Sequence, residues 1–169
     1  IVISDEIYAK LIYEGSEHLS MASLPGMKER VITLNGFSKS YAMTGWRVGW
    51  LIGPPDVAKA ATNLQSHQTS NVANVSQMAA LAAVEGPLDA VVEMRAAFDR
   101  RRVRIHGLLN AIDGVTCPEP QGAFYCYPDM SGLLGRDLNG RVAATTAELA
   151  DIVLEQAKVA FVPGEAFGL

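Results

Sequence analysis

Lys39 lies in the segment NGFSKSYAMTGWRVGW, residues 35–50, with Ser38 directly before it and Arg47 eight residues after it. A lysine amine can form an imine with a carbonyl compound. An arginine can bind a phosphate through two parallel N–H groups, and a serine hydroxyl adds another donor. Taken alone, this stretch also fits a turn with a solvated lysine, so the case for a site that combines an amine nucleophile with a phosphate-bearing ligand depends on a second stretch.

Asp5 follows a different apolar run, IVIS, which is typical of a short buried parallel strand. The run at residues 30–36 predicts a second strand, and it leads into Lys39. Ligands of open α/β sheets bind outside the carboxyl ends of the strands, so Asp5 and Lys39 face one crevice if these strands are parallel neighbours. An imine-forming lysine, an acid and a phosphate clamp are the groups that pyridoxal phosphate requires.

The remaining pattern predicts alternating strands and helices, and hence an α/β fold. Thr145 and Glu148 have the spacing of a capping box at the start of one of the helices. The expected further strands cover residues 47–55, 122–128 and 159–164, and the expected helices cover 56–66, 74–86, 88–112 and 145–156.

The helix at 88–112 is about 25 residues long, or roughly 37 Å, and can leave one core and enter another. We therefore predict two domains, residues 1–95 and 96–169, with the boundary near Ala96 inside this helix.

Composition limits the class of protein. The formal charge is −4, which gives no electrostatic reason to expect a nucleic-acid partner. No apolar run reaches the roughly 18 residues that would suggest a membrane span. One basic cluster lies within the long helical pattern, and we interpret it as a solvated helix face. Its members are Arg100, Arg101, Arg102 and Arg104.

Cysteine and histidine spacing predicts no metal site and no disulfide framework. Cys117 and Cys126 form no CxxC motif and are interpreted as incidental thiols of a reduced, cytoplasmic protein. The histidines, which are too dispersed for a ligand set, are His18, His67 and His106.

The chain starts without methionine inside an apolar run and stops just after another. We therefore expect a fragment of a longer protein, one that by itself binds cofactor poorly and shows little or no turnover.

Four stretches together resemble the class I aminotransferases, which are fold type I pyridoxal-phosphate enzymes. They are SDEIY, NGFSKSYAMTGWRVGW, QGAFY and VPGEAFG, and their order and spacing match along essentially the whole chain. The stretches GAFYCYPDMSGLLGR and VAFVPGEAFG look closest to the bacterial aspartate aminotransferases. The resemblance implies part of the large domain, with a mixed, mostly parallel sheet, plus part of the smaller α+β domain, in a protein that is a homodimer at full length.

The resemblance also implies roles for individual residues. Lys39 would form the imine with pyridoxal phosphate and then move the proton at the substrate α-carbon. Asp5 would pair with the pyridinium nitrogen and keep it protonated, so that the ring can accept electrons. Tyr8 would hydrogen-bond the phenolic oxygen of the ring.

Ser38 and Arg47 would bind the cofactor phosphate, and Phe124 would form a wall of the substrate pocket. Gly36 stands where some relatives have another phosphate-binding Ser or Thr, which leaves that contact in doubt.

The activity implied is transfer of an amino group from an amino acid, with aspartate favoured, to a 2-oxo acid, with 2-oxoglutarate favoured. Two alternatives share the same constellation: a pyridoxal-phosphate lyase of this fold, and the aminotransferase-like sensing domain of a transcription regulator. The substrate-carboxylate arginine and the upstream cofactor contacts of the family have no counterpart in these residues, so the substrate pair stays open.

Overall fold

The computed structural model describes residues 1–13 and 15–168, which form two compact units. The first comprises Ile1–Arg100 with Gln121–Phe124, and the second comprises Arg101–Pro120 with the chain from Tyr125 onward. Both units include part of helix α3 (Asp89–Asn110), which corresponds to the long helix expected from the sequence. The predicted assignment of residues 1–95 and 96–169 to two domains of a larger protein stays a prediction.

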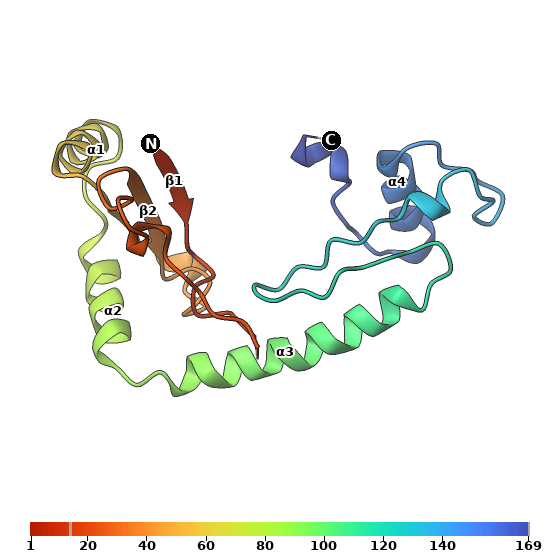
Figure 1. Ribbon diagram of the computed structural model, residues 1–169, viewed down its shortest axis with the longest axis horizontal. Helices are drawn as coiled ribbons and strands as arrows, with labels where there is room; N and C mark the ends of the chain where they lie inside the picture. Colours follow the sequence, from red (N-terminus) through yellow and green to blue (C-terminus); the bar gives the residue numbers. More distant parts are fainter. Residues whose placement is uncertain (14, 169) are drawn as a thin grey trace. The chain divides into compact units, whose positions relative to one another are not determined.

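The first unit contains a three-stranded mixed sheet with the strand order β1-β2-β3. Strand β1 (Val2–Asp5) lies parallel to β2 (Val31–Gly36) (Figure 1). In their register, Asp5 is level with Leu34. Strand β3 (Gly49–Ile52) is antiparallel to β2. All three strands lie in the runs where the sequence predicts them, and the parallel pairing is the condition on which the predicted crevice depends.

Two helices of this unit follow β3. Helix α1 (Pro55–Gln68) begins at a proline, whose fixed backbone angle suits the first turn, and has Asp56 in that turn. Helix α2 (Asn74–Glu85) ends at Gly86, whose N–H donates to the carbonyl of Ala82. The sequence predictions for both helices are confirmed.

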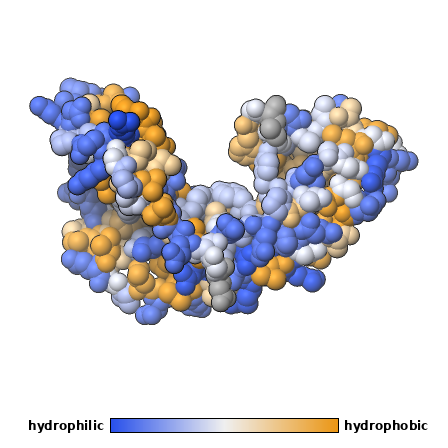
Figure 2. Space-filling model, in the orientation of Figure 1, coloured by the Kyte–Doolittle hydropathy of each residue, from blue (hydrophilic) through white to orange (hydrophobic). Residues whose placement is uncertain are grey.

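The buried apolar residues of this unit include Leu11, Tyr13, Val31 and Phe37. Helix α2, by contrast, buries only Ser76 and Ala80. Hydrophobic residues remain exposed on the surface of the unit, those of α2 being Val75, Met78, Leu81 and Val84 (Figure 2).

The second unit packs around helix α4 (Thr146–Ala157), with Ala143, Leu149 and Ile152 in its core. One half of the predicted capping box is present, because Thr145 Oγ1 accepts from the backbone N–H of Glu148. The Glu148 carboxylate reaches back to the N–H of Ala144, one residue before the cap, at 2.7 Å.

The strands predicted at 122–128 and 159–164 are wrong. The first segment makes only an isolated bridge, from Gly122 to Ile12, and the second makes no strand pairing among the described residues. An apolar or aromatic run becomes a strand only when a neighbouring strand supplies its hydrogen-bond partners.

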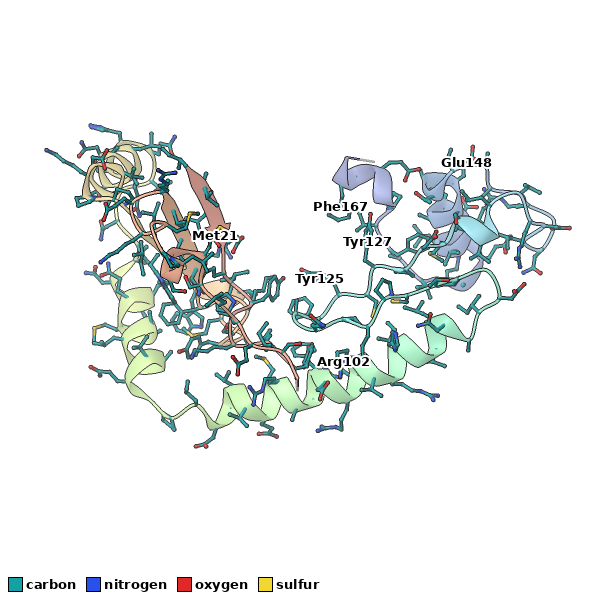
Figure 3. All side chains as sticks on the ribbon, in the orientation of Figure 1. Met21, Arg102, Tyr125, Tyr127, Glu148 and Phe167 are labelled. Carbon is teal, nitrogen blue, oxygen red and sulfur yellow. The ribbon has the colours of Figure 1, made fainter. Side chains whose placement is uncertain are left out.

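Arg102 departs from the expected solvated helix face. Its side chain is 13% exposed and donates to the Glu119 carboxylate at 2.7 Å and to the carbonyl of Pro120 at 3.1 Å (Figure 3). The interpretation as a solvated helix face is therefore wrong for Arg102. Its aliphatic chain packs along the protein while its guanidinium group remains paired.

Within the described residues, no single helix has both the length and the apolar character needed to cross a membrane. Helices α2 and α3 meet that test only as a pair, bent by 82°.

We predict that Thr145→Ala lowers the free energy of unfolding of the second unit by about 1 kcal/mol, because the Glu148 N–H loses its acceptor. Urea unfolding of the intact protein measures this loss. Thr145→Ser keeps the hydroxyl and serves as the control. Equal stability of the alanine variant and the native protein would contradict the capping role.

Candidate active site

The turn after β1 carries Asp5 and Tyr8. The Asp5 side chain is exposed, and its Oδ1 accepts from the backbone N–H of Ile7 at 3.1 Å. This short-range bond is typical of an Asx turn and fixes the direction of the carboxylate. The backbone carbonyl of Tyr8 accepts from Leu11 N–H at 2.8 Å, which continues the turn.

The turn after β2 carries Lys39, and a buried serine joins it to the turn after β1. Ser40 is 3% exposed, and its Oγ donates to the carbonyl of Ile7 at 3.2 Å. Ile7 is thus held by Asp5 through its N–H and by Ser40 through its carbonyl. Sequence reasoning missed Ser40, because its only signal was adjacency to Lys39.

Phe124 lies beside both turns. Its ring centroid is 5.3 Å from that of Tyr8, at an interplanar angle of 83°, and Lys39 Nζ lies 5.6 Å from the same centroid. Phe98 of α3 stacks on Phe124 at 5.2 Å. An aromatic ring at this distance attracts an ammonium group through its quadrupole. The structure therefore brings together Tyr8, Lys39 and Phe124, three residues far apart in the sequence.

Two contacts hold the segment 121–124 in place. Tyr13 donates its hydroxyl to the carbonyl of Ala123, and Gly122 forms a bridge with Ile12. A Cβ on Gly122 would lie 2.8 Å from Cδ1 of Ile12, a side-chain end that can rotate away, and 3.2 Å from the backbone carbonyl oxygen of Leu11. Phe124 thus contacts Lys39 from a segment whose backbone is held by Tyr13 and Ile12.

The structure gives less support to the predicted phosphate-binding pair, Ser38 and Arg47, than to the group around Phe124. Arg47 is exposed, and its Nη1 donates to the carbonyl of Thr44 at 2.8 Å. Among the residues described, no hydrogen bond joins Ser38 or Arg47 to Lys39. Arg47 has a left-handed backbone, with φ of 53°, which is uncommon for a residue other than glycine and is often found at functional sites. The phosphate-binding roles of Ser38 and Arg47 stay predictions.

Gly36 ends β2 where β3 approaches most closely. A Cβ at this position would lie 2.9 Å from the carbonyl oxygen of Val48 and 3.0 Å from Cα of Gly49. A Ser or Thr in its place would collide with the backbone of the neighbouring strand. Close strand packing therefore accounts for the glycine without any role in binding.

The fold as a whole matches that of known aminotransferases. The crystal structure of an aspartate aminotransferase from Rhizobium meliloti superposes with a TM-score of 0.93 at 42% identity, and the match covers 99% of this chain and 42% of that one. An aromatic aminotransferase from Pyrococcus horikoshii gives a TM-score of 0.88 at 39% identity, over 100% of this chain and 43% of that one. The mixed sheet and its helices are thus part of the aminotransferase fold.

The chain belongs to the family described as aminotransferase class I and II, whose sequence model matches residues 1–169. It is 60% identical to an aspartate aminotransferase of Streptomyces avermitilis over 99% of this chain and 41% of that protein. An aspartate aminotransferase of Geobacillus stearothermophilus is 46% identical over 99% of this chain and 42% of that protein. The chain therefore spans about two fifths of the length of these curated relatives. The family identified from the motifs is confirmed.

We predict that Gly36→Ala destabilises the intact protein by about 1 to 3 kcal/mol, because the added methyl group must push β3 away from β2. Chemical unfolding measures the change. Gly45→Ala is the matched control, since a Cβ there meets no atom within 4 Å. A Gly36→Ala protein as stable as the control would show that the two strands separate at no cost.

Proposed function

We propose that the intact protein is a pyridoxal-phosphate-dependent aminotransferase that passes an amino group from aspartate to 2-oxoglutarate. The proposal is supported by membership of the class I and II family, which uses this cofactor, and by the 60% identity to an aspartate aminotransferase. The observation that carries it is the convergence of Lys39 and Tyr8 on Phe124, next to the strand that ends in Asp5.

The chemistry of these side chains fits the cofactor. Lys39 supplies a primary amine and Asp5 an exposed carboxylate at the end of the adjacent parallel strand. Tyr8 supplies a phenol that can donate a hydrogen bond. When bound, pyridoxal phosphate links to a lysine amine and withdraws electrons from the α-carbon of the amino-acid substrate.

Each residue then has a defined task. Asp5, held in direction by the Ile7 N–H, keeps a proton on the ring nitrogen, because a carboxylate stabilises a neighbouring cation. Tyr8 donates to the ring oxygen. The Lys39 amine, freed when the amino-acid substrate displaces it, would take the proton from the substrate α-carbon as a general base and would deliver it as a general acid to the cofactor carbon that bore the imine.

The finer assignments belong to the same proposal. Ser38 and Arg47 bind the phosphate, and Phe124 forms a wall of the pocket. The first unit corresponds to the end of the large cofactor-binding domain and the second to part of the small domain. The intact protein is a cytoplasmic homodimer whose partners are amino acids and 2-oxo acids.

We predict that Lys39→Ala in the intact protein abolishes covalent attachment of pyridoxal phosphate and lowers kcat/KM by at least about a thousandfold, because the proton-transfer group is lost. The visible absorbance of the bound cofactor and a coupled aspartate assay measure the two effects. Lys59→Ala, which removes an exposed lysine of α1, is the control. Covalent cofactor in the Lys39 variant would overturn the assignment.

The substrate pair has its own test. A relative from Cereibacter sphaeroides, 43% identical over 99% of this chain and 42% of that protein, is an aspartate/prephenate aminotransferase. We predict that kcat/KM with aspartate is highest for 2-oxoglutarate in a panel of amino acceptors that includes prephenate. A higher value with prephenate would replace the proposed acceptor and leave the proposed reaction class intact.

A further inference from the structure

Glu6 is a buried carboxylate to which the proposed chemistry gives no task. It follows Asp5 directly, and its backbone N–H extends the strand pairing by donating to the carbonyl of Leu34 at 2.8 Å. The residue is 8% exposed. An ionised carboxylate is rarely buried to this extent unless it is fully hydrogen-bonded, so its partners indicate what it holds.

Four donors surround this carboxylate. Oε1 accepts from Ser4 Oγ at 3.1 Å, from Ser20 Oγ at 2.9 Å and from the backbone N–H of Met21 at 3.2 Å, while Oε2 lies 3.0 Å from His18 Nε2. Met21, labelled in Figure 3, begins the short helix Met21–Ser23. Glu6 thus ties the segment 18–21 to the end of β1.

The balance of these contacts keeps Glu6 ionised. Burial by itself would raise the pKa of Glu6, but the hydrogen bonds from His18, Ser20, Met21 and Ser4 outweigh it and hold the pKa below its ordinary value. Hydrogen bonds to a charged group are stronger than those between neutral groups. The cluster is therefore a firm anchor.

Glu6 and Asp5 lie on opposite sides of the same strand end. Successive side chains of a strand point to opposite faces. The hydrogen bond from Ser4 to Glu6 shows that the side chains of Ser4 and Glu6 lie on the same face. Asp5 accordingly points to the other face. Two contacts fix the peptide unit that joins Asp5 and Glu6. They are the hydrogen bonds of the buried Glu6 carboxylate and the bond from the Glu6 N–H to the carbonyl of Leu34. Any rotation of this unit would turn the Asp5 carboxylate.

We propose that Glu6 is a positioning residue for the cofactor site: its buried carboxylate locks the end of β1 to segment 18–21 and so sets the direction of Asp5 and Tyr8. The inference rests on the proposed function. The four donors around the Glu6 carboxylate all belong to the protein, so Glu6 acts through the backbone that it shares with Asp5.

The test measures pyridoxal-phosphate affinity and the pH titration of the visible band of the bound cofactor, both in the intact protein. Glu6→Ala is expected to weaken cofactor binding about tenfold and to shift the titration midpoint, because Asp5 loses its fixed direction. Glu6→Gln retains an oxygen acceptor for Ser20 and Met21 and is expected to restore most of the affinity. Ser20→Ala removes one donor and is expected to shift both readouts in the same direction, but less, should Glu6→Ala not fold.

Glu17→Ala is the matched control, because it removes an exposed carboxylate directly before segment 18–21. If Glu6→Ala and Ser20→Ala lower only the unfolding temperature, with cofactor affinity and the titration equal to those of the control, Glu6 is merely structural and the inference is overturned. If the native protein itself fails to bind pyridoxal phosphate, the proposed function is overturned instead, so the two failures are distinguishable.

Discussion

The parallel pairing of β1 with β2 is the constraint on which the site depends. Parallel strands end at the same edge of a sheet, so the turns after Asp5 and Gly36 emerge side by side. The bond from Ser40 to Ile7 then joins one turn to the other. Without this register, the carboxylate and the amine would belong to separate surfaces and could not act on one ligand.

Buried polar contacts give the two turns their rigidity. Glu6 and Ser40 are both nearly inaccessible to solvent, and each bonds to a segment distant in the sequence. Breaking such a bond leaves a buried polar group unsatisfied, which costs more than the bond itself contributes on average. Exposed Asp5 is thus held by groups that are themselves buried, which combines access for a ligand with a fixed direction.

Aromatic contacts place Phe124 beside the two turns that carry Tyr8 and Lys39. Phe124 contacts Tyr8, Phe98 and Lys39 because the Tyr13 hydroxyl and the bridge between Gly122 and Ile12 hold its backbone segment in place. The motif around Phe124 was visible in the sequence, but Phe98 was visible only as one apolar position of a long helix. Its contact with Phe124 depends on the course of α3, which periodicity alone does not define.

The sequence by itself determined the three strands and the four long helices, because local periodicity is a property of the chain. Its motifs also singled out Asp5, Tyr8, Lys39 and Phe124 as candidate site residues, through their resemblance to a known family. The false strands at 122–128 and 159–164 show its limit, since a strand requires a partner that no local pattern specifies. Tertiary structure alone decided the contacts of Ser40 and Glu6 and the burial of Arg102, because burial and long-range hydrogen bonds depend on segments that only folding brings together.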